Sequence, residues 1–443
     1  MNRRSFFAKV ASALAKTSPS MTMRTNSHGD KISLLGYGMM RLPTLDGRAP
    51  GEFLKDDPKK RNVDQEMLNR QIDYAIENGV NYFDVAPVYC KGYCEKATAI
   101  ALSRHPREKW RLATKASNFA KSLWPIEKSK QMYYDSMKTF NVDYIDYYLL
   151  HACGIGGGFS DFESRFLKNG FLDFLVKERE AGRIKNLGWS FHGDFKCFRW
   201  FLEHHKDYKW DFAQIQLNYL DWRHAKLSSK RNFNAELLYD ELTKRNIPVV
   251  VMEPLLGGRL AKYNEKSAQR LAGLDDEATP AKWAMRFAGT HKNVLTVLSG
   301  MTLLEHLEEN VATFSPLKPL NEEEFAALER AAQAMISDNA IQCNMCNYCM
   351  PCPYGLDIPS TFDFWNRADV EGWLPTDPTD PKFRENARRF LIEYDRTLPK
   401  LRQSARCTTC GRCSVHCPQG LDIPSYMCKV DAFVEKVRRI VNA

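Results

Sequence analysis

Eight cysteines near the C-terminus have the type and spacing of metal-cluster ligands. The first run has two residues between successive cysteines and a proline behind the last: Cys343, Cys346, Cys349 and Cys352. The second run has the spacing C-x2-C-x2-C-x3-C-P: Cys407, Cys410, Cys413 and Cys417. This spacing gathers several thiolates around one small site and is typical of cubane iron–sulfur clusters, each of which needs four thiolates. The two runs therefore predict two 4Fe-4S clusters.

Structural zinc is the alternative, because C-x-x-C pairs also bind zinc. Zinc sites usually combine two pairs of ligands, whereas this chain has two runs of four cysteines with a proline behind each. The pattern favours iron–sulfur.

An internal repeat relates the two runs. The octapeptide 353–360 recurs at 418–425 with one substitution, so we expect two related half-sites packed about a pseudo-twofold axis. In two-cluster ferredoxins the fourth cysteine of each run serves the other cluster. By that analogy one cluster is held by Cys343, Cys346, Cys349 and Cys417, and the other by Cys407, Cys410, Cys413 and Cys352.

A second set of polar residues lies earlier in the chain, each at or near the end of a short apolar run. These residues are Asp84, Lys115, His151, Ser190, Gln214, Glu253 and Ser299. An isolated Asp or Lys inside an apolar strand is costly unless it is paired. We therefore expect Asp84 and Lys115, on neighbouring strands, to pair.

Four of the early residues could together protonate a carbonyl. Tyr89 would hold its proton at neutral pH, and a nearby Lys115 ammonium would lower the tyrosine pKa. Asp84 would keep the lysine charged, and His151 would hold the substrate oxygen, while a reducing cofactor supplies hydride. The alternative for each residue is structural, such as a buried ion pair or an aromatic side chain packed on a rim.

The segments that must position these residues alternate between short apolar runs and amphipathic stretches. We expect strands at 32–39, 82–86, 111–116, 147–151, 186–190, 212–218, 248–253 and 294–300. We expect helices at 63–78, 94–103, 128–140, 166–180, 195–204, 235–245, 279–289 and 303–314. Eight such units predict a (β/α)8 TIM barrel, in which the C-terminal strand ends meet at one mouth. The alternative is an open doubly wound sheet, but no G-x-G-x-x-G follows the first strand.

With these motifs the chain resembles the aldo/keto reductase family. The resemblance rests on Asp84-x4-Tyr89, on Lys115 and His151 after the next two strands, and on the segments 187–190, 214–218, 253–258 and 308–310. It covers residues 31–315. With the cysteine runs, the whole chain is similar to bacterial members of the family that carry a C-terminal 4Fe-4S ferredoxin-type domain.

The resemblance implies a role for each matching residue. Tyr89 would be the general acid, Lys115 and Asp84 would tune it, and His151 would orient the carbonyl. Four further residues would bind NADP or NAD, the first two at the nicotinamide and the others at the adenine: Ser190, Gln214, Glu309 and Asn310. The chain departs from the family pattern at Phe191, at Met252 and at His306, and the choice between NADP and NAD stays open.

The expected organisation has four parts. Residues 1–30 form a disordered or signal-like segment, 31–315 the barrel, 316–342 a linker helix, and 343–443 a smaller, mostly helical two-cluster ferredoxin-like domain. The expected function is an oxidoreductase acting on a small-molecule carbonyl or alcohol, with a redox partner protein as a further possible contact. The alternatives are an electron-transfer protein whose barrel is a docking module and a reductase whose clusters are purely structural.

Composition narrows the class of protein. The net charge is +9, and residues 380–443 contribute an excess of six positive charges, which two anionic clusters would largely offset. We therefore expect no nucleic-acid partner.

No apolar run approaches the ~18 residues of a membrane span. Arg3 and Arg4 resemble a twin-arginine export signal, but the apolar stretch behind them stops at Lys16, so the cytoplasm is the expected location and export the alternative.

Overall fold

The computed structural model describes residues 20–442, apart from 229–230, 263–264 and 337–339. Its centre is a closed barrel in which all neighbouring strands are parallel, in the order β10-β3-β4-β5-β6-β7-β8-β9. The strands are β3 (Leu35–Gly38), β4 (Tyr82–Asp84), β5 (Arg111–Ala116), β6 (Ile145–Cys153), β7 (Ile184–Phe191), β8 (Phe212–Gln216), β9 (Val249–Met252) and β10 (Val294–Ser299). The predicted eight-stranded barrel is confirmed, and an open sheet is excluded.

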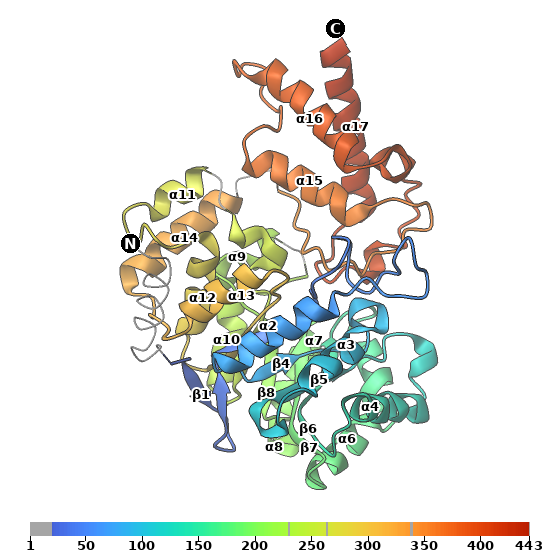
Figure 1. Cartoon of the computed structure of the whole chain (residues 1–443), viewed down its shortest axis with the longest axis vertical. Coiled ribbons are helices and arrows are strands. Elements are labelled where there is room, and N and C mark those ends of the chain that lie inside the picture. The colour runs from blue at the N-terminus through green and yellow to red at the C-terminus, as the bar shows by residue number, and fades with distance from the viewer. Residues whose placement is uncertain (1–19, 229–230, 263–264, 337–339, 443) are drawn as a thin grey trace, which may run out of the picture.

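Helices on the outside of the barrel connect the strands (Figure 1). They are α2 (Gln65–Glu77), α3 (Cys94–Leu102), α4 (Ile126–Phe140), α5 (Phe159–Phe162), α6 (Phe171–Glu180), α7 (Phe195–Glu203), α8 (His205–Tyr208), α9 (Asp221–Ser228), α10 (Ala235–Thr243), α11 (Glu265–Leu271), α12 (Pro280–Thr290) and α13 (Leu304–Thr313). The ring forms because the strands are mostly apolar and buried while the helices are amphipathic, so both faces of the sheet are covered. All nine residues of β6 are buried, for example.

The N-terminal part of the described chain differs from expectation. Residues 20–30 are ordered, and β1 (Met23–Thr25) pairs antiparallel with β2 (Lys31–Ser33). Asn26 in the turn donates to the Tyr147 hydroxyl over 2.9 Å, and Ile32 belongs to the apolar cluster inside the barrel. The hairpin is therefore held by the barrel interior. The signal-like residues 1–19 lie outside the described residues.

The bounds of one expected strand and one expected helix differ in the structure. The strand expected at 32–39 is divided between β2 and β3, because the Ser33 hydroxyl donates to the Leu35 carbonyl over 2.7 Å at the break. The helix expected at 166–180 begins only at Phe171, because Gly170 has a positive φ of 72° and ends the preceding short π-helical segment.

The segment 316–342, expected to be a linker helix, contains α14 (Glu322–Ile336), which packs on the outside of the barrel. Glu324 accepts two hydrogen bonds from Arg286 of α12, over 2.8 and 2.9 Å, and Glu329 contacts His224 of α9 at 2.6 Å. This helix is therefore part of the outer layer of the barrel.

The C-terminal region is mostly helical, as predicted, and has its own apolar core. Its helices are α15 (Ile358–Val370), α16 (Phe383–Thr397) and α17 (Ile423–Asn442). The repeated octapeptides start two of them, because Asp357 caps α15 through the Ser360 amide and Asp422 accepts from the Ser425 amide at the start of α17. The three helices lie together above the barrel in Figure 1.

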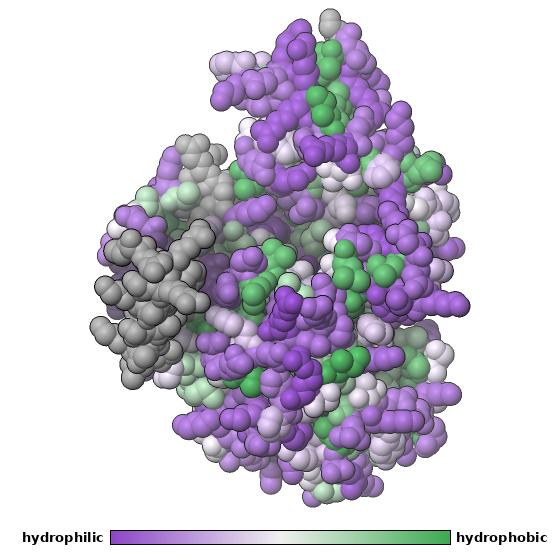
Figure 2. Space-filling view, viewed as in Figure 1, coloured by the Kyte–Doolittle hydropathy of each residue, from purple (hydrophilic) through white to green (hydrophobic). Residues whose placement is uncertain are grey.

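The face seen in Figure 2 is mainly hydrophilic, with small, separate apolar patches. None of the helices in the described ranges has the length and apolarity needed to cross a membrane.

Candidate active site and cluster ligands

A buried ion pair stands at the mouth of the barrel. Lys115 Nζ lies 2.5 Å from Asp84 Oδ1 and donates to the Val85 carbonyl over 2.8 Å. Both side chains are buried, and β4 and β5 place them side by side. The same ammonium lies 4.8 Å from the ring centre of Tyr89. The structure therefore brings three of the four expected catalytic residues together.

Burial governs the ionisation of these groups. It raises the pKa of Asp84 and lowers that of Lys115, and the attraction between the two charges opposes both shifts. Burial also raises the pKa of Tyr89 well above its ordinary value, and Tyr348 and Asp84 raise it further. This differs from the expectation that Lys115 lowers the pKa of Tyr89, because desolvation of the phenolate outweighs the attraction of the ammonium. Tyr89 therefore retains its proton at neutral pH.

His151, the fourth expected catalytic residue, faces Tyr89 edge-on, with 5.8 Å between ring centres. Its Nδ1 lies 2.7 Å from Ser117 Oγ, and its carbonyl accepts from Arg165 over 2.8 Å. Burial, followed by the positive charges of Lys115 and Arg165, lowers the pKa of His151 well below its ordinary value. The ring is therefore neutral, and in the tautomer in which Nδ1 accepts from the Ser117 hydroxyl, Nε2 carries the proton and can donate it to a ligand oxygen.

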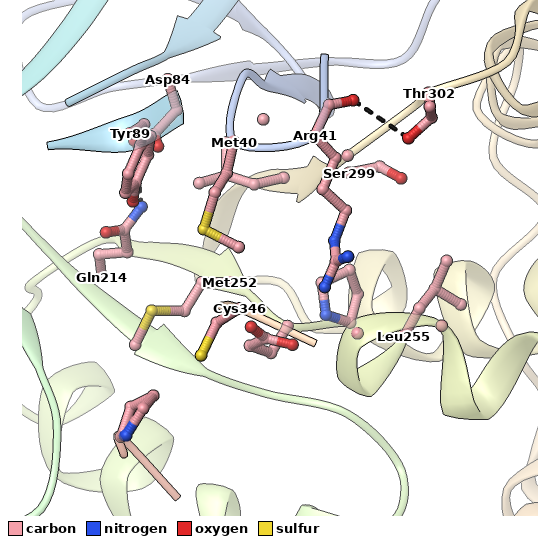
Figure 3. Close-up of a pocket in the computed structure, with 18 of the residues that line it drawn as sticks. Met40, Arg41, Asp84, Tyr89, Gln214, Met252, Leu255, Ser299, Thr302 and Cys346 are labelled. Carbon is pink, nitrogen blue, oxygen red and sulfur yellow. Dashed lines mark hydrogen bonds between the residues drawn. The ribbon is translucent and has the colours of Figure 1, made fainter. Parts of the chain in front are cut away.

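A cavity of about 360 Å³ opens beside these groups (Figure 3). Six of the eight expected catalytic and cofactor-binding residues line it: Asp84, Tyr89, His151, Gln214, Glu309 and Asn310. Lys115 is screened behind Asp84 and Tyr89, and Ser190 does not line the cavity. The cavity thus extends from the ion pair to α13.

The two residues expected at a nicotinamide carboxamide differ in position. Gln214 lines the cavity and donates from Nε2 to Asp84 Oδ2 over 3.2 Å. The Ser190 hydroxyl instead accepts from the Ala152 amide over 2.7 Å and is buried. Because Ala152 has a positive φ of 50°, this bond holds the bend that directs His151. Ser190 therefore contacts the backbone next to His151 and does not reach the cavity.

The two residues expected at the adenine lie at the far end of the cavity. Asn310 donates to the Ser299 hydroxyl over 3.1 Å, and the Glu309 carboxylate accepts from the Thr279 hydroxyl. Amide and carboxylate oxygens in such a place can accept from an amino group or a ribose hydroxyl. The side chains present thus fit a nicotinamide dinucleotide.

Three cavity residues come from the C-terminal region: Cys346, Tyr348 and Pro418. Arg41, which also lines the cavity, donates to the Asn344 carbonyl over 2.5 Å. Gly257, with a positive φ, packs against the same backbone, where a Cβ would lie 2.3 Å from the Asn344 oxygen. Cys346 extends into the cavity toward Met252 in Figure 3. Sequence reasoning missed this contact, because nothing in either segment alone indicates the other.

The cysteine thiols fall into two adjoining groups. Burial raises the pKa of Cys343 to about 11 and that of Cys346 to about 12, and the nearby Cys417 thiol adds to both shifts. Burial likewise raises the pKa of Cys349, with Cys346, Cys343, Cys417 and Cys413 as neighbours. Cys417 therefore stands with the first run.

The second group is centred on Cys407. Burial raises the pKa of Cys407, and Cys428, Cys352 and Cys410 add to the shift. Burial also raises the pKa of Cys413, whose thiol neighbours are Cys407 and Cys410. Cys417 thus neighbours the first run and Cys352 the second, while Cys413 also neighbours Cys349 and Cys428 also neighbours Cys407.

Comparison with known proteins gives a match for each part of the chain. Residues 35–333 match the model of the aldo/keto reductase family, and residues 342–421 match that of a 4Fe-4S dicluster domain. The second match supports iron–sulfur clusters over zinc at the cysteine runs. The first match covers most of the barrel and α14.

Individual relatives are distant. L-galactose dehydrogenase of Arabidopsis thaliana is 22% identical over 311 residues, which cover 66% of this chain and 87% of that protein. Protein tas of Escherichia coli (strain K12) is 28% identical over 155 residues, which cover 29% of this chain and only 45% of that protein. The solved aldo-keto reductase AKR11C1 of Bacillus halodurans has the same fold, with a TM-score of 0.54 over 71% of this chain and 97% of that chain at 23% identity.

Proposed function

The chain belongs to the aldo/keto reductase family and continues into a 4Fe-4S region, and from this premise we propose that it is an iron–sulfur oxidoreductase. The reaction would move a hydride between NADPH or NADH and a small carbonyl or alcohol substrate. The observation that carries the proposal is the cavity where Tyr89, His151 and the Asp84–Lys115 pair meet.

The residues would act as follows in the direction of reduction. Bound NAD(P)H would supply the hydride to the carbonyl carbon. His151 donates from Nε2 to the carbonyl oxygen and fixes its position, and Tyr89 gives that oxygen its proton. Lys115 stabilises the phenolate left on Tyr89, and Asp84 keeps the ammonium charged and in place. In the direction of oxidation, Tyr89 accepts the proton of the alcohol.

Gln214, Glu309 and Asn310 are the side chains proposed to hold the dinucleotide. Ser190 is proposed to act through the backbone bond to Ala152, which orients the neighbouring His151. Both NADP and NAD remain candidates, because the residues proposed at the adenine end are one carboxylate, Glu309, and one amide, Asn310.

The thiol groups are proposed to hold two clusters. Cys417 would complete the cluster of the first run, and Cys352 would complete that of the second, as their neighbours support. A cluster carries one electron, whereas hydride carries two, so electrons passing to a partner protein would leave one at a time. The position of Cys346 at the cavity favours a redox role for the clusters over a purely structural one.

Turnover of an aldehyde panel with NADPH or NADH, measured on anaerobically prepared protein with its iron and sulfide counted, tests the proposal. The expected result is turnover that falls about 10²–10⁴-fold in Tyr89→Phe, because the general acid is lost. Tyr354→Phe is a matched control, because that tyrosine is exposed. It lines neither this cavity nor the second cavity that lies between the barrel and the cysteine-rich region. Equal turnover in wild type and Tyr89→Phe would contradict the assignment of Tyr89.

A further inference from the structure

A second cavity of about 620 Å³ lies beside the first, between the barrel and the cysteine-rich region. Its barrel wall includes Val88, Phe119 and Ile155. Its opposite wall comes from both cysteine runs and includes Met350 and Val415. The cavity is therefore closed only when the C-terminal region is docked on the barrel mouth.

The two cavities share five residues: Met40, Tyr89, Ile155, Cys346 and Tyr348. Tyr89 from the barrel and Tyr348 from the C-terminal region are thus both part of the wall that the two cavities share. The proposed proton donor thus stands at the boundary between the two cavities. Consider a substrate whose carbonyl oxygen meets Tyr89 and whose carbonyl carbon faces the first cavity. The rest of that substrate would lie in the second cavity.

The chemistry of the second cavity differs from that of the first. Tyr89, Phe119 and Tyr348 contribute aromatic rings, and the thioethers of Met40 and Met350 add soft apolar surface. Charged side chains and one imidazole complete the lining: Lys91, Lys121, Asp161, Arg165 and His416. The guanidinium of Arg165 lies 4.7 Å from the centre of the Phe119 ring and keeps that ring in place. Aromatic and thioether side chains pack well on flat aromatic ligands.

We infer that the second cavity is the substrate pocket for an aromatic aldehyde or ketone, and that Tyr348 in the cluster-binding run is one of its specificity-determining residues. The claim that the ligand reacts in this pocket rests on the proposed function. The claim that an aromatic ligand binds there does not. Tyr348 lies between the cluster ligands Cys346 and Cys349, so the loop that holds the first cluster also shapes the pocket.

Naphthaldehyde and propanal serve as probes of turnover, and naphthalenemethanol serves as a probe of binding by calorimetry without nucleotide. Tyr348→Ala is expected to raise the KM for naphthaldehyde about tenfold and to change that for propanal less than about twofold, because only the larger probe needs the ring. Tyr348→Phe keeps the ring and should behave like wild type. Tyr354→Ala is the matched control, because this tyrosine lies two residues after Cys352 but is exposed and does not line the pocket.

A second variant separates an effect on the pocket from an effect on the cluster, because Tyr348→Ala changes the loop that holds cluster ligands. Val415 lines the pocket and is 58% exposed, so Val415→Trp should fold and fill the space. We expect it to weaken naphthalenemethanol binding about tenfold at unchanged iron content. Unchanged binding in both Tyr348→Ala and Val415→Trp would overturn the pocket assignment. Absence of turnover with normal, variant-sensitive binding would instead reject the proposed reaction and keep the pocket.

Discussion

Cys346 and Tyr89 line the same two cavities, although one belongs to the cluster-binding region and the other to the barrel. Two hydrogen bonds join the C-terminal region to the barrel near its mouth. Arg41 donates to the Asn344 carbonyl over 2.5 Å, and Gln419 donates to Gln216 over 3.3 Å. A cluster on Cys346 would therefore border the reacting carbonyl, and cluster assembly and substrate binding should depend on each other.

The first prediction concerns which run Cys417 completes. Cys417→Ala and Cys343→Ala should each lower the iron content by about half, and their combination should lower it no further, because both remove ligands of one cubane. Combining Cys417→Ala with Cys407→Ala should remove nearly all the iron. Iron analysis and electron paramagnetic resonance of the reduced protein measure this.

Cys428→Ala is the matched control for these variants, because Cys428 lies near Cys407 but outside both runs. Its iron content should equal that of the wild type. If the pair Cys417→Ala and Cys407→Ala instead retains half of the iron, Cys417 serves the second run and the ligand assignment is wrong.

The second prediction concerns the buried pair. Lys115→Met leaves the Asp84 carboxylate buried without its partner and should lower the free energy of unfolding by about 3–5 kcal/mol. Adding Asp84→Asn removes the uncompensated charge and should restore part of the stability without restoring turnover. Urea unfolding of the single and double variants provides the measurement. A loss below about 1 kcal/mol in Lys115→Met would mean that the carboxylate is solvated or protonated.

The barrel and most of its mouth were predictable from the sequence for a physical reason. A parallel strand buried on both faces must be apolar throughout, so the polar residues that end it, such as Asp84 and His151, are conspicuous. Parallel strands point the same way, and their ends therefore converge. The cysteine spacing is equally local, since four thiolates must reach one small cluster.

What could not be predicted depends on contacts between distant segments. The hairpin at β1 and β2 has strands of three residues, too short for a periodic pattern. The place of Tyr348 at the barrel mouth depends on how the C-terminal region docks. The net shift of the Tyr89 pKa is upward and not downward as expected from Lys115, because sequence reasoning considers the neighbouring charge and not the depth of burial.

The third prediction compares a buried ion pair with an exposed one. Arg286 and Glu324 are 1% and 4% exposed and join α12 to α14, whereas Arg223 and Glu236 are 53% and 35% exposed. Arg286→Met should cost about 3–5 kcal/mol, because Glu324 remains buried and unpaired. Arg223→Met should cost less than about 1 kcal/mol. Similar losses in the two variants, measured by urea unfolding, would show that α14 is not anchored by this pair.

The fourth prediction concerns acid stability. Burial, with Lys115 as a second cause, lowers the pKa of His151 well below its ordinary value and that of His192 to about 4. Between about pH 6.5, the ordinary imidazole pKa, and these lower values, the unfolded chain binds protons that the folded protein does not. The two histidines therefore make the free energy of unfolding fall as the pH decreases through this range, by up to about 1.4 kcal/mol per pH unit for each of them.

The test compares unfolding of the wild type with that of His192→Gln at several pH values from 7 to 5. Because glutamine does not titrate there, the variant should lose stability less steeply than the wild type as the pH falls. Above about pH 7 the two slopes should coincide, since the imidazole is neutral in both the folded and the unfolded chain. Taking the difference between the two proteins cancels any acid lability of the clusters, which they share. Parallel curves over the whole range would show that His192 titrates normally in the folded protein, and that the mouth of the barrel is open to water at that residue.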